Sequence, residues 1–257
     1  MEVDQLTEFV ADLLDGQALS RDELVSELIQ DKRFTGMEEQ LRSGWGALLK
    51  PLAWQGALCY GPSRSSKVTF TNPAGFLENW DGLPDPAQAA PAVIKRYLSV
   101  YGPATPETFD AWLSRNSNKK STLRGWFASL GEQVVEVRVE DETRYLLAEH
   151  EDELADTQPS RATRLLGAFD QFVLGPGTKD THMLANEHRS RVSKAAGWIA
   201  PVLTQGGRIT GVWEMDDGNL VVTPFPGEQA PPSKALEDAA ARLAAVHGLA
   251  KVTPRVG

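Results

Sequence analysis

The chain has 257 residues, of which 41% are hydrophobic and 24% are charged. This is the composition of an ordinary globular protein, and it excludes a disordered chain and a collagen-like chain. The formal net charge is −9, from 26 Lys and Arg against 35 Asp and Glu, which taken alone argues against a nucleic-acid partner.

The sequence predicts a cytoplasmic protein that does not cross a membrane. Its apolar runs are far shorter than the roughly 18 residues of a membrane span. Residues 1–5 are acidic, whereas a signal peptide begins with a basic segment. The lone cysteine, Cys59, lies in an apolar run, so we expect a buried hydrophobic side chain rather than a disulfide.

The first 72 residues predict helices followed by a β-hairpin. Apolar residues at helical spacing indicate an amphipathic helix over 3–14. Ser20, with Glu23 three positions later, is the capping box that opens a second helix. A third helical stretch runs from Trp45 to Ala53. Two strands follow, at 57–61 and 68–71, joined by a polar tip.

A second unit repeats this order. Prolines and glycines interrupt regular structure over 72–91, so we place a linker at 73–90. Thr105 then opens a helix 85 positions after Ser20, in the equivalent place. Helices and a hairpin in this order predict a winged helix, the hairpin-bearing form of helix-turn-helix. We therefore assign winged helices to 1–72 and 91–158.

The C-terminal part, 159–257, has a sequence pattern typical of strands rather than of helices. Alternating apolar residues and glycine-containing turns predict a β-rich module, and Ser233 is the expected N-cap of a final helix that ends at Gly248. The strands are expected at 165–174, 198–203, 208–214 and 220–223. The fold class is therefore α+β, with two tandem winged-helix units followed by a β-rich C-terminal module and a terminal helix.

Counted by region, the charge is uneven. It is −7 over 1–90, −4 over 91–156 and +2 over 157–257, and residues 111–131 contain no Asp or Glu. That segment is the expected recognition helix, and its basic residues either contact DNA phosphates or form an ordinary solvated face. The acidic tip of the second hairpin, 140–142, should not touch DNA. The candidate DNA-binding residues are Arg64, Lys67, Arg115, Lys119, Lys120, Arg124, Arg189, Arg191 and Lys194.

Catalytic motifs are scarce. The four histidines do not have metal-ligand spacing, and no phosphate or dinucleotide loop is present, so we expect neither a metal nor a cofactor. Asp170 is a carboxylate in an otherwise apolar predicted strand. It is either an acid or base with a shifted pKa, or, in the favoured interpretation, a carboxylate held by backbone amides, Arg161 or Arg164.

Several segments together resemble one family. Residues 165–175 read LLGAFDQFVLG and are similar to the "LLPAFDxYLLG" signature of winged-helix proteins related to the AlkZ and YcaQ DNA glycosylases. Residues 96–105 resemble the family's "RYLxxYGPAT" segment, 19–24 its "LTRAEL" helix start, and 56–62 its "GLLxxGP" hairpin.

The resemblance implies tandem winged helices and a β-rich module around duplex DNA. Active members excise alkylated bases or unhook interstrand crosslinks without a metal, using a Gln-x-Gln or Gln-x-Asp pair in an earlier winged helix. None of the eleven glutamines here has Gln or Asp two positions later. We therefore expect a non-catalytic protein that binds double-stranded DNA, with its acidic face turned to solvent, to a protein partner or to a missing N-terminal domain.

Two alternatives stay open. One is an active repair glycosylase that uses a different carboxylate, such as Asp170. The other is a winged-helix module for protein interaction, which the acidic surface would suit.

Overall fold

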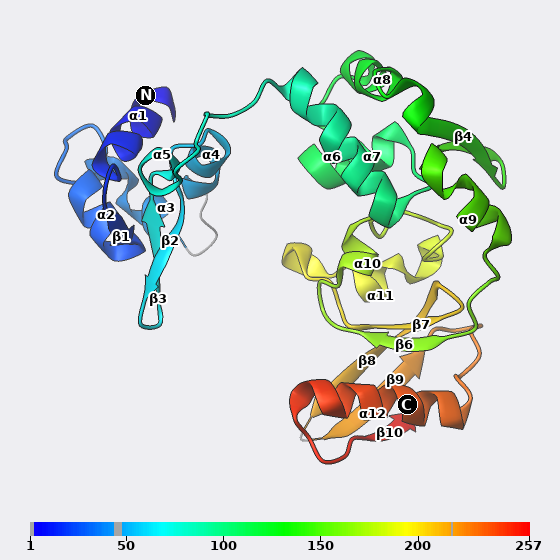
Figure 1. The fold of residues 1–257 in the computed structure, drawn as a ribbon. Coiled ribbons are helices and arrows are strands. Elements are labelled where there is room, and N and C mark those ends of the chain that lie inside the picture. Colours follow the sequence, from blue (N-terminus) through cyan, green and yellow to red (C-terminus); the bar gives the residue numbers. More distant parts are fainter. Residues whose placement is uncertain (1–2, 44–47, 217) are drawn as a thin grey trace. The chain divides into compact units, whose positions relative to one another are not determined.

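The computed structural model describes residues 3–43, 48–216 and 218–257. Its contacts divide the chain into two compact units, Met1–Gln88 and Ala89–Gly257. Helices and strands are mixed throughout, and the last part of the chain is a sheet with a terminal helix (Figure 1). The α+β prediction is confirmed.

In the first unit, helices surround one apolar core and a hairpin extends away from it (Figure 1). Strand β2 pairs antiparallel with β3 and ends the helical part of the unit. The core contains Leu24, Leu28 and Leu52, which are fully buried. The elements are α1 (Val3–Leu13), β1 (Ala18–Ser20), α2 (Arg21–Leu28), α3 (Glu38–Arg42), α4 (Leu49–Trp54), β2 (Cys59–Arg64), β3 (Lys67–Thr71) and α5 (Pro73–Phe76).

The capping box at the start of α2 is confirmed. The Ser20 backbone N–H donates to Glu23 Oε2 at 2.7 Å, and the Glu23 N–H donates to Ser20 Oγ at 3.4 Å. The short strand β1 was not expected. It pairs with β3 through Ala18–Thr71 and Ser20–Thr69, so β3 is the central strand of a three-stranded sheet with the order β1-β3-β2. The predicted third helix begins only at Leu49, and its Trp45 lies outside the described residues.

The second unit begins with three helices and a hairpin. They are α6 (Pro86–Tyr101), α7 (Pro106–Ser114), α8 (Lys120–Ala128), β4 (Val134–Val139) and β5 (Glu142–Leu147). Thr105 caps α7 by accepting from the Thr108 N–H at 3.1 Å, as expected. Ala104 forms an isolated antiparallel bridge with Tyr145 of β5. This bridge corresponds to the β1–β3 pairing of the first unit, because Ala104 lies 85 positions after Leu19.

The predicted absence of regular structure over 72–91 holds for 77–85 and is wrong at both ends. Helix α5 and the start of α6 lie there, and Pro91 is inside α6. Pro73 and Pro86 are tolerated because the first residues of a helix need no N–H partner within it. Pro91 removes one backbone hydrogen bond from α6. The burial of Ile94 and Tyr97, on the next turns of the helix, stabilises the helix in spite of this loss.

The C-terminal sheet has the strand order β10-β9-β8-β7-β6. Helix α12 lies along one face, where Leu236 and Ala240 pack on Leu220 and Val222 (Figure 1). Residues of α10 and α11 cover the other face. The elements are α9 (Glu151–Asp156), β6 (Thr163–Leu166), α10 (Gln171–Leu174), α11 (Arg189–Val192), β7 (Val202–Gln205), β8 (Arg208–Asp216), β9 (Asn219–Pro224), α12 (Ser233–His247) and β10 (Thr253–Val256).

Two predictions for this module need correction. The expected strand 165–174 ends at Leu166, because Phe169 has a φ of +58° and Asp170 then begins the helix α10. Ser233 is the first residue of α12 rather than its N-cap, which is Pro232. The C-cap at Gly248 is confirmed, with a φ of +66°.

We predict that Ser20→Ala destabilises the chain by about 1 kcal/mol, because the Glu23 N–H at the start of α2 loses its acceptor, the Ser20 hydroxyl. Urea unfolding measures this change. Ser26→Ala is the matched control, since Ser26 is exposed inside the same helix and should be neutral or slightly stabilising. Equal effects of the two substitutions would contradict the role of the cap.

Candidate nucleic-acid interface

Helix α8 presents one basic face. Leu123 and Phe127 are buried, whereas Lys120 and Arg124 are exposed on the opposite side. Gly125 is exposed beside Arg124, and a Cβ added to it would meet no atom within 4 Å. A flat, positively charged helix face of this kind can approach a polyanion closely.

The loop before α8 adds two more exposed cations. Arg115 ends α7 in the left-handed conformation, with a φ of +56°, and Lys119 is the N-cap of α8. No ion pair in the described part of the chain involves Arg115, Lys119, Lys120 or Arg124. The structure therefore groups all four residues predicted for this segment, and it leaves their charges available to a ligand.

A buried carboxylate shapes this loop. Asp110 is 2% exposed, and its Oδ1 accepts from Asn118 Nδ2 at 2.7 Å and from the Ser114 hydroxyl. Its backbone carbonyl accepts from the Asn116 N–H at 3.3 Å. Asp110 was not among the residues predicted from the sequence. The four-residue spacing of Asp110 and Ser114 places both on one face of α7, whereas Asn118 reaches Asp110 from the loop that follows the helix.

In the first hairpin, the two predicted cations have different environments. Arg64 donates from Nη1 to both carboxylate oxygens of Glu23 at 3.2 Å and from Nη2 to the Ala18 carbonyl. Arg64 thus joins the hairpin to the start of α2. Lys67, at the turn, is exposed and makes no ion pair among the described residues, so only Lys67 presents an unneutralised charge.

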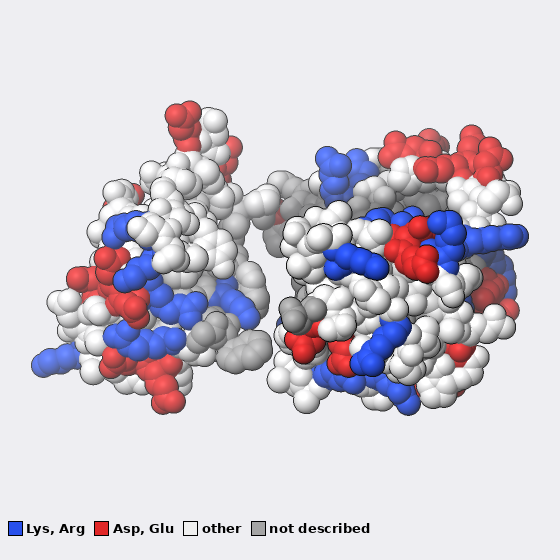
Figure 2. Space-filling model, turned by 90° about the horizontal axis from the view of Figure 1, so that it is seen from below, with Lys and Arg blue, Asp and Glu red and all other residues white. Residues whose placement is uncertain are grey.

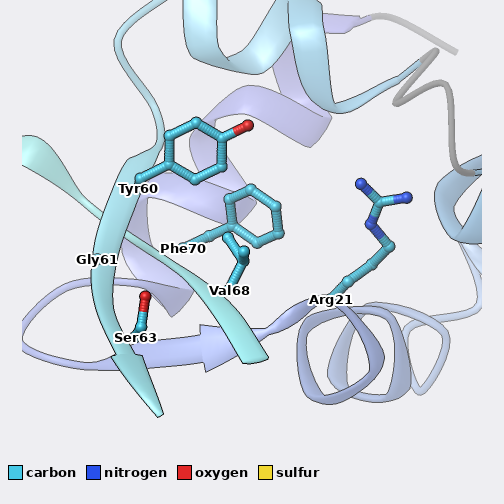
Figure 3. A pocket seen from close by; sticks show the side chains of 6 residues that line it. All are labelled: Arg21, Tyr60, Gly61, Ser63, Val68 and Phe70. Carbon is cyan, nitrogen blue, oxygen red and sulfur yellow. The ribbon is translucent and has the colours of Figure 1, made fainter. Parts of the chain in front are cut away.

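A shallow hollow of about 330 Å³ lies on one face of this hairpin (Figure 3). The rings of Tyr60 and Phe70 stack with centroids 5.8 Å apart, and Val68 lies beside them. Arg21 reaches the same side from the start of α2, and its Nη1 donates to the Ser43 carbonyl at 2.7 Å. Tyr60 is 75% exposed, so the same hairpin that bears Lys67 at its turn also presents an aromatic ring.

The third predicted cluster follows His188. Arg189 is half-buried and donates to the Thr178 hydroxyl at 3.3 Å, which gives it a structural partner. Arg191 and Lys194 are exposed and line a separate groove of about 550 Å³. Asp170 lies at the start of α10 rather than inside a strand. Its Oδ1 accepts from the Phe172 N–H at 2.8 Å, the ordinary role of a helix N-cap.

Acidic residues are interspersed with these cations. Figure 2 shows Lys and Arg side chains alternating with Asp and Glu side chains over both units. Arg144 is neutralised inside the second unit, by Glu142 at 2.9 Å and by the buried Asp180 at 3.2 Å.

Among the described residues, no group of three or more His, Cys, Asp or Glu could hold a metal ion, and no helix is long and apolar enough to cross a membrane.

The chain as a whole matches one known class of protein. The family model described as DNA glycosylase AlkZ-like matches residues 1–246. The chain therefore belongs to the AlkZ-like DNA glycosylase family, and the resemblance stated from its sequence motifs is confirmed.

Relatives in this family are similar over nearly the whole chain. The interstrand DNA cross-link repair glycosylase of Streptomyces sahachiroi is 56% identical over 256 residues, which are 99% of this chain and 69% of that protein. The solved structure of Streptomyces sahachiroi DNA glycosylase AlkZ has a TM-score of 0.93 and 56% identity over the same shares of the two chains. The expectation that a preceding catalytic winged helix is missing stays a prediction.

The capping carboxylate of α2 gives a pH-dependent prediction. Its hydrogen bond with the Ser20 backbone, then the bond with the Ser20 hydroxyl, and then the charges of Arg64 and Lys67 lower the pKa of Glu23 below 4.5. A lowered pKa in the folded state means that ionised Glu23 stabilises the fold above pH 4.5, and that this stabilisation is lost as the pH falls through the folded pKa.

We therefore predict that Glu23→Gln lowers the Tm at pH 7 and that the difference from the unsubstituted chain shrinks below pH 4.5. Thermal unfolding followed by circular dichroism over a pH series measures it. Glu27→Gln removes the same charge from the same helix and should show a smaller, flatter difference. A Glu23→Gln difference that grows on acidification would contradict the assignment.

Proposed function

We propose that this chain binds duplex DNA through the basic face of α8 and the loop before it. The observation that carries the proposal is the set of four exposed cations, Arg115, Lys119, Lys120 and Arg124, in a segment, 111–131, that contains no Asp or Glu. Like charges at the i, i+4 spacing of Lys120 and Arg124 repel each other unless an anion lies between them. The phosphates of a DNA backbone supply that anion.

The two helix-and-hairpin segments support a winged-helix interpretation. In a winged helix, the third helix enters the major groove and the hairpin lies along the backbone. In the second unit α8 takes the place of that third helix. Its hairpin tip, Glu140 and Asp141, is acidic and should point away from phosphate, whereas the first hairpin offers Lys67 and Tyr60.

Family membership supports DNA as the partner, because the relative is named as an enzyme that repairs interstrand DNA cross-links. That name also favours a second candidate function, excision of a damaged base by this chain. Hydrolysis of the glycosidic bond needs a polar group that holds water beside the sugar. The sequence has no Gln-x-Gln or Gln-x-Asp pair, and the carboxylate of Asp170 already accepts a hydrogen bond as the N-cap of α10. We therefore propose binding without excision.

Salt dependence tests the binding proposal. We predict that the logarithm of the association constant for a plain duplex falls linearly with log salt concentration, and that each of Lys119→Gln, Lys120→Gln and Arg124→Gln reduces the steepness of that slope by about 0.9. Fluorescence anisotropy of a labelled duplex measures both quantities. Arg138→Gln on the second hairpin removes the same charge and should leave the slope unchanged. Binding that is absent at low salt would favour the protein-interaction alternative.

A strand-cleavage assay tests the second candidate. We predict that the chain releases no base from alkylated duplex DNA, as judged by the absence of alkali-labile abasic sites. A DNA glycosylase active on the same substrate is the positive control. Robust release that Asp170→Asn abolishes would instead establish excision by a non-standard carboxylate.

A further inference from the structure

Two aromatic side chains stand exposed together in the C-terminal module. Phe169 and Trp198 are 42% and 52% exposed, and their rings meet edge to face with centroids 5.0 Å apart and planes at 84°. The residues are 29 positions apart in the sequence, so the fold itself assembles the pair. Neither α8 nor the first hairpin contributes to it.

The backbone at this pair is strained. Phe169 has a φ of +58°, a conformation that a bulky side chain rarely adopts. Ala196, in the tight turn just before Trp198, has a φ of +54°. A glycine at either position would avoid the strain. Exposed aromatic rings do not stabilise a core, so a strained backbone that presents one is typical of a binding site.

Trp213 of β8 anchors both segments. Its indole Nε1 donates to the Leu166 carbonyl at 2.8 Å, and its backbone N–H donates to the Pro201 carbonyl at 3.2 Å. Leu166 lies three residues before Phe169, and Pro201 lies three residues after Trp198. The two loops that carry the rings are therefore each tied to Trp213 of the sheet, within three residues of the ring.

One cation is joined through its backbone to the aromatic pair. Lys194 donates its backbone N–H to the Trp198 carbonyl at 2.8 Å, and the neighbouring Ser193 and Ile199 form an antiparallel bridge. The backbone of Lys194 therefore lies beside that of Trp198. Lys194 and Arg191 also line the groove of about 550 Å³, together with Trp213, Met215 and the carboxylate of Glu214.

We propose that Phe169 and Trp198 form a stacking platform for an unpaired nucleobase of the bound DNA, with Arg191 and Lys194 holding the flanking phosphates. The inference rests on the proposed DNA binding and names a second, separate contact. An exposed ring stacks on any base, and the ring stays rigid because it has few rotatable bonds. Paired bases inside a duplex do not offer their faces, so the platform favours DNA with an unstacked base.

The test compares two DNAs of equal length with the full chain. One is a perfect duplex, and the other carries a single bulged 2-aminopurine, whose fluorescence falls when it stacks on an aromatic ring. We expect the chain to bind the bulged duplex about 5- to 100-fold more tightly than the perfect one and to quench the probe. We expect Trp198→Ala and Phe169→Gly to remove this preference and the quenching, with affinity for the perfect duplex unchanged.

Phe169→Gly separates stacking from folding, because it removes backbone strain as well as the ring. Its Tm should equal or exceed that of the unsubstituted chain while the preference is lost. Ala196→Gly relieves similar strain and keeps both rings, so it should retain the preference. Trp198→Phe should retain most of it. Trp54→Ala, which removes a tryptophan that is 73% exposed in the first unit, should leave it intact.

The possible results are distinct. A preference that survives Trp198→Ala would overturn the platform, as would equal affinity of the unsubstituted chain for both DNAs, although duplex binding itself would stand. If Trp54→Ala also lost the preference, the effect would come from exposed aromatic side chains in general and not from the Phe169–Trp198 pair, which would overturn the inference. Failure to bind either DNA would overturn the proposed function and the platform together.

Discussion

The arrangement of the basic surface depends on the buried carboxylate of Asp110. Ser114, the last residue of α7, and Asn118 of the following loop donate to its Oδ1, and its own carbonyl accepts from the Asn116 N–H. A buried carboxylate is costly unless hydrogen bonds satisfy it, and here Ser114 and Asn118 provide them. The turn must therefore fold back on the end of α7. This geometry separates α7 from α8 and leaves the basic face of α8 outside.

The net charge of −9 conceals this local arrangement. Most acidic residues lie in the first unit and around the second hairpin, and several cations are neutralised inside the fold. Arg64 joins the first hairpin to α2, and Arg144 joins β5 to Asp180. Such pairs serve the structure, so they add nothing to the attraction of an anion. The number of Lys and Arg residues therefore indicates the attraction for an anion only when these paired residues are left out of the count.

The sequence predicts well where local chemistry decides the structure. Ser20 and Thr105 cap helices as expected, because N-cap preference depends on neighbouring residues alone. The sequence predicts poorly where distant contacts decide it. Phe169 breaks the expected strand through a backbone conformation that its neighbours do not specify. The pairing of Arg64 with Glu23, 41 residues away, likewise appears only in three dimensions. In the same way, helical periodicity predicted the basic face of α8 from the sequence. The contact between Phe169 and Trp198 could not be predicted, because only the folded chain brings these residues together.

Hydrogen–deuterium exchange of the full chain, with and without a plain duplex, tests the central claim most directly. The account predicts slower exchange of backbone amides over Arg115–Ala128 when DNA is bound, with the second hairpin, Val134–Leu147, unchanged. Protection of that acidic hairpin while α8 exchanges as before would contradict the account.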